Sequence, residues 1–347
     1  MYLEGKKKKM QEQKKEKDIC LRWSMTISSR HKTEKKESER IAGYIRNALL
    51  GEVFTTPKPG LVDLWDSGAH TDMNWITFQK STDAVTPYLT QMYEAGYEFS
   101  GEPGQDSLEQ LFCMIRDIGR KAEKAMYRAT AGVNTHKGMI FSMGILCAAY
   151  GYCKGRKARG QKILVNDILD TAKQMTGRVL TEELKTLEEQ RVPQTNGERL
   201  LSESGERGIR GEVLDGFPVV RDVAYPELSE AMKQKEMDPA ICQSQVNLQV
   251  LLSIMKNLRD TNILNRGQES GLVWVQQEAE CILRLGGAFS DAGMDRIIHM
   301  NQECIRRNLS SGGAADQLAL TLLLWQIEHG REIPVYCPKC TSEKTCR

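Results

Sequence analysis

Residues 108–122, LEQLFCMIRDIGRKA, decide the fold class of this chain. Apolar residues recur in the stretch every three or four positions, at Leu108, Leu111, Phe112, Ile115, Ile118 and Ala122. Residues with that spacing lie on one face of an α-helix. The stretch therefore predicts an amphipathic helix whose apolar face packs on neighbouring helices.

The same helical spacing continues on both sides of this stretch. It begins at residue 37 and recurs through residues 78–89, 163–189, 246–258, 272–285, 297–309 and 314–327. The alternation typical of β-strands is absent, and no segment repeats at a fixed period. The sequence predicts a single all-α domain of about ten helices, with polar, glycine-rich loops between them forming the active site.

Composition and charge limit the class of protein. Of the 347 residues, 40% are hydrophobic and 27% are charged, which is typical of a globular protein. The net charge of +2 hides lysine-rich clusters within residues 1–40, which have no sustained apolar face. We therefore expect a basic, flexible arm at residues 1–36, a helical domain at residues 37–331 and a cysteine-containing tail at residues 332–347.

The sequence argues against a membrane or nucleic-acid partner. No stretch is as long and apolar as a membrane span, and no signal-peptide core follows the lysine-rich start. Outside the arm the chain is mildly acidic, which does not favour nucleic acid. We expect a cytoplasmic protein with neither kind of partner.

The chain has ten cysteines. Cys113, Cys147 and Cys281 fall in helical patterns, where we expect reduced, buried thiols. Three others near the C-terminus form half of a zinc-binding pattern: Cys337, Cys340 and Cys346. Only His329 is near enough in sequence to add a ligand, so we favour a reduced tail over a zinc site.

The densest polar segment is residues 56–72, TPKPGLVDLWDSGAHTD. It holds two prolines, two glycines, one lysine, three aspartates and a histidine. The prolines fix the backbone on either side of Lys58, so the segment can hold polar side chains in a set geometry. It is interpreted as a functional loop, although an ordinary connection between helices is the alternative.

A second polar segment, residues 132–141, GVNTHKGMIF, leads into an apolar helix. Asn134, His136 and Lys137 stand at its start, where free backbone N–H groups attract anions. The alternative is capping by Asn134 or Thr135 alone. Similar polar breaks occur later, in RGEVLDGFP at residues 210–218 and DTNILNRG at residues 260–267.

Taken together, five motifs give the chain a family resemblance. TPKPGLVD with GAHTDM, GVNTHKGMIF, RGEVLDGFP, DTNILNRG and SGGAADQLA occur in this order from about residue 55 to residue 319. In these motifs the chain resembles the triphosphoribosyl-dephospho-coenzyme A synthases. It departs from the family pattern after DTNIL, where that family often has a histidine before the arginine and paired glycines after it, and in SSGG, where the family has an SPGG-like string.

The resemblance implies a transferase acting on ATP and 3′-dephospho-coenzyme A. A ribose hydroxyl of the latter would attack C1 of the ATP ribose, adenine would leave, and the triphosphate would stay on the sugar. The product, 2′-(5″-triphosphoribosyl)-3′-dephospho-coenzyme A, is the prosthetic-group precursor of citrate lyase or malonate decarboxylase. A separate transferase would load it onto the acyl carrier protein.

This chemistry needs particular side chains. Breaking the N-glycosidic bond builds positive charge on the sugar, adenine must gain a proton and the hydroxyl must lose one. We predict that Asp63 accepts the hydroxyl proton and His70 helps to protonate adenine. The two roles could be exchanged, Asp63 could bind metal, and His70 could be a buried histidine with one hydrogen bond.

Both substrates carry phosphates, so cations must gather around them. The predicted substrate-binding residues are Lys58, Asn134, His136, Lys137, Arg210, Asn262 and Arg266. We also expect Mg²⁺, held by Asp72, Glu212 and Asp260. For these carboxylates, helix capping and salt bridges are the alternatives.

Two other kinds of function compete with the transferase. A non-catalytic, all-α nucleotide-binding regulator would need the cations but not the carboxylates and histidines. A nucleic-acid-binding protein would use the basic arm and would bind in a strongly salt-dependent way. Neither explains the five ordered motifs.

Overall fold

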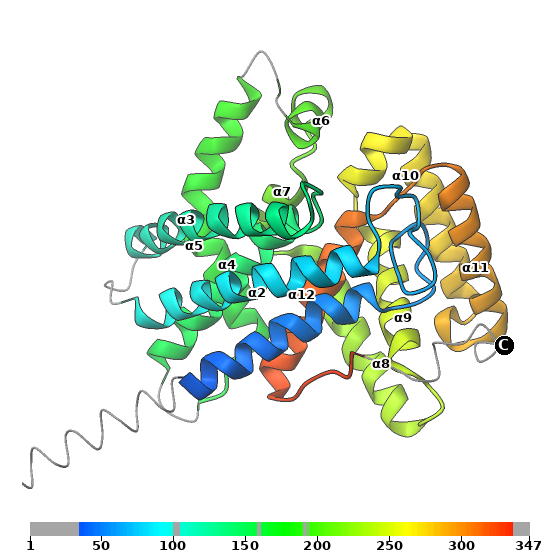
Figure 1. Cartoon of the computed structure of the whole chain (residues 1–347), viewed down its shortest axis with the longest axis horizontal. Helices are drawn as coiled ribbons and strands as arrows, with labels where there is room; N and C mark the ends of the chain where they lie inside the picture. The colour runs from blue at the N-terminus through cyan, green and yellow to red at the C-terminus, as the bar shows by residue number, and fades with distance from the viewer. Residues whose placement is uncertain (1–34, 100–104, 158–160, 190–192, 194, 336–347) are drawn as a thin grey trace, which may run out of the picture. The chain divides into compact units, whose positions relative to one another are not determined.

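The computed structural model describes residues 35–99, 105–157, 161–189, 193 and 195–335 (Figure 1). Residues 1–41 and residues 42–347 form separate compact units, and the site described below lies within the second. Most of the predicted basic arm, and the tail cysteines Cys337, Cys340 and Cys346, lie outside the described residues.

The described residues form twelve α-helices and no strand, which confirms the all-α prediction and slightly exceeds the expected number of helices. A helix that ends at residue 53 comes first. The others are α2 Trp75–Glu98, α3 Gln105–Ala129, α4 Lys137–Arg156, α5 Val165–Glu188, α6 Asn196–Ser204, α7 Gly208–Asp215, α8 Tyr225–Met237, α9 Gln243–Asn257, α10 Thr261–Arg284, α11 Asp291–Arg306 and α12 Gly312–His329. A π-helical turn, η1 Val220–Ala224, precedes α8, and a 3₁₀ turn, η2 Gly287–Phe289, precedes α11.

Helix α12 lies at the centre of the helical body. It packs against α4, α5, α8, α9 and α10. Every residue from Gln317 to Ile327 is buried. A helix that is apolar on all sides must be surrounded by other helices, as α12 is. Its first turn is therefore held firmly, and that turn reaches the site.

Helices α2 and α4 pack closely because glycines face the partner backbone. A Cβ atom at Gly151 would lie 2.0 Å from the carbonyl oxygen of Tyr93, and one at Gly96 would lie 2.1 Å from that of Ala148. Only glycine permits such an approach. The contact fixes the direction of α4, whose N-terminus forms another wall of the site.

The apolar face predicted for residues 108–122 is confirmed, whereas two of the three cysteines predicted to be buried are exposed. Leu108, Leu111, Phe112, Ile115 and Ala122 are buried in α3, and Ile118 is half-buried. Cys147 is buried as expected, whereas Cys113 and Cys281 are exposed. Each of these two stands beside a buried residue in its helix, and one step along a helix turns the side chain by about 100°, out of the apolar face.

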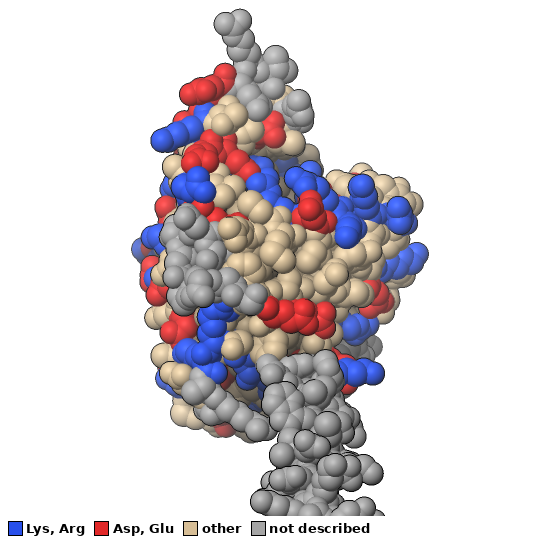
Figure 2. All heavy atoms as spheres, turned by 90° about the vertical axis from the view of Figure 1, so that its left-hand side faces the viewer, with Lys and Arg blue, Asp and Glu red and all other residues tan. Residues whose placement is uncertain are grey.

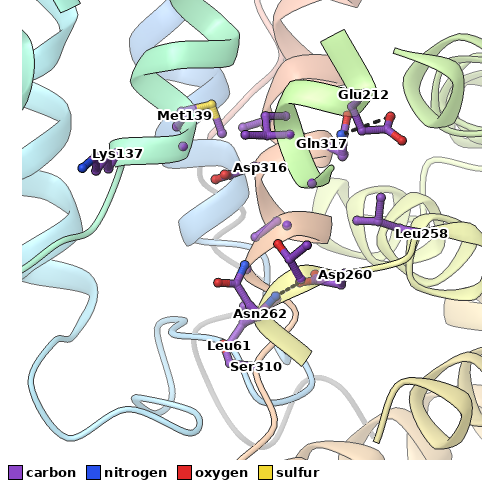
Figure 3. Close-up of a pocket in the computed structure, with 18 of the residues that line it drawn as sticks. Leu61, Lys137, Met139, Glu212, Leu258, Asp260, Asn262, Ser310, Asp316 and Gln317 are labelled. Atoms are coloured by element: carbon purple, nitrogen blue, oxygen red, sulfur yellow. Dashed lines mark hydrogen bonds between the residues drawn. The ribbon is translucent and has the colours of Figure 1, made fainter. Parts of the chain in front are cut away.

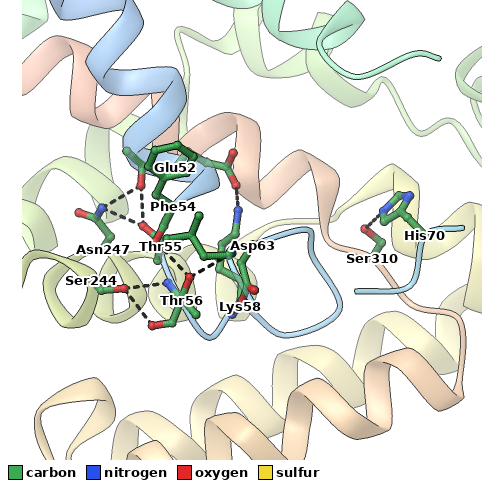
Figure 4. Close-up of polar contacts among 12 residues, drawn as sticks. Glu52, Phe54, Thr55, Thr56, Lys58, Asp63, His70, Ser244, Asn247 and Ser310 are labelled. Atoms are coloured by element: carbon green, nitrogen blue, oxygen red, sulfur yellow. Dashed lines mark hydrogen bonds and ion pairs between the residues drawn. The ribbon is translucent and has the colours of Figure 1, made fainter. Parts of the chain in front are cut away.

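The polar loop between residue 53 and α2 is tied to distant helices. The Thr56 N–H donates to the Ser244 hydroxyl at 2.7 Å, and that hydroxyl donates to the Thr56 carbonyl at 2.9 Å. Asn301 accepts from the Gly60 N–H at 2.8 Å and donates to Asp66 at 2.9 Å. The loop is thus anchored on α11 and, as Figure 4 shows for Thr56 and Ser244, on α9.

Away from the loop, acidic and basic side chains are interspersed on the face shown in Figure 2. Ion pairs such as Arg116 with Glu183 and Arg178 with Glu109 link α3 to α5. None of the described helices has the length and apolar character needed to cross a membrane.

Candidate active site

Four helices begin at one pocket of about 760 Å³ (Figure 3). The lining includes the first residues of α4, α7, α10 and α12, together with the residues just before them. Each helix N-terminus carries unpaired N–H groups and a partial positive charge. Their convergence makes the pocket a suitable site for a polyanion.

Asp260 fixes two of these helix starts. One carboxylate oxygen accepts from the Asn262 N–H at 2.8 Å, and the other accepts from the Ala314 N–H at 2.9 Å. The side chain thus caps α10 and also holds the first turn of α12. Burial raises the pKa of Asp260. Both oxygens already bond to backbone donors, which favours the capping alternative over metal ligation.

Asp316, the fifth residue of α12, faces a buried ion pair. Glu52 and Lys58 form that pair, and they are 7% and 1% exposed. Asp316 accepts no hydrogen bond from the described residues, and its Oδ2 would lie 2.8 Å from a Cβ at Gly138 in α4. Burial, and then the charges of Glu52 and Asp260, raise the pKa of Asp316 well above its usual value. Asp316 therefore keeps its proton where an ordinary aspartate has lost it.

His136 is a neutral residue of the pocket wall. Its Nδ1 lies 2.7 Å from the Ser81 hydroxyl, which also accepts a hydrogen bond from Thr135 at 2.7 Å. Ser81 has one proton to donate, and Nδ1 receives it, so Nε2 carries the ring proton. Burial, and then the charge of Lys58, lower the pKa of His136 to about 3. The ring can donate a hydrogen bond without carrying charge.

Arg266 and His70 form another part of the wall. Arg266 donates to the Ala69 carbonyl at 2.8 Å and to Asn308 at 3.1 Å, and it lies 3.4 Å from His70 Nδ1. His70 Nε2 lies 2.8 Å from the Ser310 hydroxyl. Burial, and then the Arg266 charge, lower the pKa of His70. Its ring is therefore neutral at pH 7.

The cations of the pocket differ in their partners. Arg207 pairs with Asp215 at 2.5 Å, and Arg259 pairs with Glu206 at 2.6 Å. Lys58 pairs with Glu52. Arg266 forms no ion pair with a described carboxylate, so its charge is the most available to a bound phosphate.

Nine of the predicted site residues line this pocket: Lys58, His70, Asn134, His136, Lys137, Glu212, Asp260, Asn262 and Arg266. Lys137 is half-exposed, 3.8 Å from Glu123, and its N–H donates to the Asn134 side chain at 3.2 Å. Three predicted residues do not line the pocket: Asp63, Asp72 and Arg210.

Asp63 is buried inside its own loop. It is 1% exposed and accepts hydrogen bonds from the N–H groups of Lys58, Trp65 and Asp66, at 2.8, 2.7 and 3.1 Å. Burial raises its pKa to about 6, although the three N–H groups act in the opposite direction. The geometry gives Asp63 a clear task in shaping the loop around Lys58.

The predicted magnesium ligands do not come together. Within the part of the chain that the structure describes, no three histidine, cysteine, aspartate or glutamate side chains are grouped closely enough to hold a metal ion. Asp260 has backbone donors on both oxygens, and Glu212 accepts from the Val219 N–H. Asp72 is exposed, and its charge acts on both His70 and Arg266.

Among the pocket residues that sequence reasoning missed are Glu52, Asp316 and Gln317. Asp316 and Gln317 stand inside the motif SGGAADQLA, two alanines after a glycine pair that opens a helix. A carboxylate soon after such a pair is a usable signal, because glycines let a ligand approach the helix start. Glu52 stands in a helical pattern and gave no signal.

Comparison with known proteins agrees with the resemblance seen in the motifs. Residues 38–335 match the family model described as ATP:dephospho-CoA triphosphoribosyl transferase. A probable 2-(5″-triphosphoribosyl)-3′-dephosphocoenzyme-A synthase of Vibrio cholerae is 35% identical over 311 residues, covering 89% of this chain and 95% of the relative. The synthase of Pectobacterium atrosepticum is 39% identical over 284 residues, covering 81% and 87%. A probable synthase of Citrobacter koseri is 39% identical over 289 residues, covering 83% and 91%.

No solved structure matches the chain. The family model nevertheless spans most of its length, and the motifs that carried the resemblance fall inside the matched region. On this evidence, the chain belongs to the ATP:dephospho-CoA triphosphoribosyl transferase family.

Proposed function

We propose that this protein transfers the triphosphoribosyl group of ATP to the 2′-hydroxyl of 3′-dephospho-coenzyme A and releases adenine. One observation carries the proposal: a half-buried carboxyl group, Asp316, lies in a pocket where four helix N-termini meet. The helix starts suit a polyphosphate, and the carboxyl group suits proton transfer to a leaving base.

The triphosphate would bind near Arg266 and Asn262. Arg266 forms no ion pair with a described carboxylate, and the positive ends of α10 and α12 face the same pocket. Lys137, half-exposed at the start of α4, would contact the second substrate or the outer phosphates. The Glu52–Lys58 pair is neutral as a whole, so Lys58 adds little net charge for phosphate binding.

Asp316 would give its proton to adenine as the N-glycosidic bond breaks. The attacking hydroxyl then releases one proton as its oxygen bonds to C1 of the ribose. Asp316 takes up that proton, directly or through water, and returns to its starting state. One bond breaks, one forms and one proton is passed on, so the reaction needs no external acid.

The two catalytic residues predicted from sequence are assigned differently here. A neutral His70, bonded to Ser310 and next to Arg266, suits phosphate binding better than proton donation. Asp63, bonded to three backbone N–H groups, suits positioning of Lys58. Both catalytic assignments stay predictions that substitution can test.

Mg²⁺ is proposed with the triphosphate rather than as a resident ion. Asp72 is exposed beside Arg266 and His70, and hard oxygen ligands suit this metal. Mg²⁺ is commonly held by one or two carboxylates and the substrate's own phosphates, so Asp72 would suffice. The ion would neutralise phosphate charge there.

The test is incubation of the full chain with ATP, Mg²⁺ and 3′-dephospho-coenzyme A, with free adenine and the coupled product measured by chromatography. We expect adenine and product in equal amounts. Adenine release that does not require 3′-dephospho-coenzyme A would reassign the protein as a nucleosidase. ATP binding without adenine release would favour the non-catalytic regulator.

The product would pass to a separate transferase that loads an acyl carrier protein. Citrate lyase and malonate decarboxylase use the same prosthetic group, so either pathway fits this proposal. The chemistry assigned to the pocket is the same in both cases.

A further inference from the structure

Gln317 carries a buried hydrogen-bond acceptor with no partner. Its side chain lines the pocket and is 2% exposed. Its amide nitrogen donates to Glu212 at 3.5 Å, whereas its carbonyl oxygen, Oε1, accepts nothing from the described residues. An unsatisfied buried acceptor destabilises a fold, and such groups in native proteins call for an explanation.

The position of this oxygen sets it apart from other buried polar atoms. Four side-chain atoms of the described residues are buried without a partner: Trp65 Nε1, Thr82 Oγ1, Arg221 Nε and Gln317 Oε1. Of these four residues, only Gln317 lines the pocket. A ligand in the pocket would therefore lie next to Gln317, whereas the other three residues are outside the lining.

We propose that Gln317 selects adenine by accepting a hydrogen bond from its 6-amino group. This inference rests on the proposed function and names the residue that reads the base. A glutamine side chain has a donor and an acceptor side by side, and it pairs well with the amino group and ring nitrogen of adenine.

Glu212 holds the amide in the required orientation. Its carboxyl group accepts from the amide nitrogen of Gln317 at 3.5 Å, which leaves the amide oxygen without a partner (Figure 3). Glu212 itself is fixed by the Val219 N–H. Pro218, Val219 and Leu258 are apolar residues of the lining that suit a flat purine ring.

The neighbour of Gln317 in the chain bears on the inference. Asp316 precedes it in α12, and both side chains line the same pocket. The two side chains point about 100° apart, Asp316 toward Gly138 of α4 and Gln317 toward Glu212 of α7, so a base between them would have to span the pocket. Recognition and proton transfer would use consecutive residues of one rigid helix.

The proposal predicts which nucleotides are rejected. Inosine triphosphate has a carbonyl oxygen where ATP has the amino group, so two acceptors would face each other at Gln317. Purine riboside triphosphate has neither group and would only lose the hydrogen bond. We expect ATP to be favoured over inosine triphosphate by about 10- to 100-fold, with purine riboside triphosphate between them.

The experiment compares two glutamines of α12. Gln317→Met removes the unpartnered oxygen with little change in volume. Gln326→Met is the matched control, because Gln326 is equally buried but fully bonded, donating to the Tyr44 carbonyl at 3.0 Å and accepting from the Ile333 N–H at 3.1 Å. Equilibrium binding of the three nucleotides and base release are measured for the parent and both variants.

We expect Gln317→Met to bring the ratio of ATP to inosine triphosphate binding close to one while its melting temperature holds or rises. Gln326→Met should lower the melting temperature and keep the parental ratio. A parental ratio in Gln317→Met would overturn the inference. Because binding is measured separately from base release, a protein that binds ATP selectively but releases no adenine would refute the proposed function alone.

Discussion

The loop at residues 56–72 and the first turns of α12 are both rich in polar groups, yet they use them in opposite ways. In the loop, Asp63 accepts three backbone hydrogen bonds, and Thr56 exchanges two with Ser244. In α12, Asp316 accepts no hydrogen bond from the described residues, and Gln317 keeps an unpartnered oxygen. The polar groups of the loop make hydrogen bonds that fix its shape, whereas Asp316 and Gln317 of α12 line a pocket.

This contrast separates polar groups that stabilise the fold from polar groups that are available to a ligand. A polar group whose bonds are satisfied within the protein contributes to the fold, and its loss appears first as lost stability. A polar group buried without a partner is tolerated when a ligand completes it. On this view catalysis belongs to α12 and the shape of the site to the loop.

The largest expected effect comes from Asp316→Asn. The amide has the same size as the carboxyl group but no proton to transfer, so turnover should fall by about 100- to 10,000-fold. ATP affinity and the melting temperature should stay near those of the parent. Chromatographic measurement of adenine release at saturating substrates checks this.

A substrate with a better leaving group sharpens the test. When ATP is methylated at N7 of adenine, the base leaves as neutral 7-methyladenine and needs no proton. The difference in turnover between the parent and Asp316→Asn should therefore be much smaller with this substrate. An undiminished difference would show that Asp316 does not protonate the base.

The next effect concerns phosphate binding. Arg266→Ala removes a pocket cation that pairs with no described carboxylate, so ATP affinity should fall by about 10- to 100-fold. Arg210→Ala is the matched control, because Arg210 was also predicted to bind substrate but does not line the pocket. Calorimetric titration with ATP compares the two variants. Equal losses of ATP affinity would show that Arg266 does not bind the phosphates directly.

The sequence allowed prediction of what depends on local spacing, and little of what depends on long-range packing. The helix at residues 108–122 was predictable because its apolar period is set by nearby residues. The nine predicted residues that line the pocket lie in polar breaks before helices, which are also visible in the sequence. Asp63 and Asp316 could not be told apart, because Asp63 bonds to its own loop whereas Asp316 packs on Gly138 of a distant helix.

A smaller effect, on stability, tests the loop. Asp63→Asn leaves one acceptor oxygen for three N–H donors, so the free energy of unfolding should drop by about 1–3 kcal/mol. The folded fraction of this variant should keep most of the parent's turnover per molecule. Urea unfolding and activity at low temperature measure the two quantities. A variant of parental stability without turnover would instead support Asp63 as the predicted general base.

The smallest effect is a pH dependence at Glu212. Burial, and then the charge of Asp215, raise its pKa from 4.5 to about 7. A raised carboxyl pKa means that its contribution to stability is complete below pH 4.5 and is lost as the pH rises through 7. Above pH 7 the ionised group would also repel the triphosphate, by about two- to fourfold in affinity for charges roughly 10 Å apart in a water-like dielectric.

Glu212→Gln stays neutral, so it should remove the trend in affinity and weaken the trend in stability. Its ATP affinity at pH 8 should equal its affinity at pH 6, apart from the titration of ATP itself, which the parent shares. Thermal unfolding between pH 4 and pH 8 should show a decline in the parent that is shallower in the variant. If parent and variant keep the same pH profile, Glu212 does not titrate in this range. The carboxyl group that orients Gln317 would then be charged throughout, and the contrast between the loop and α12 would rest on Asp316 and Gln317 alone.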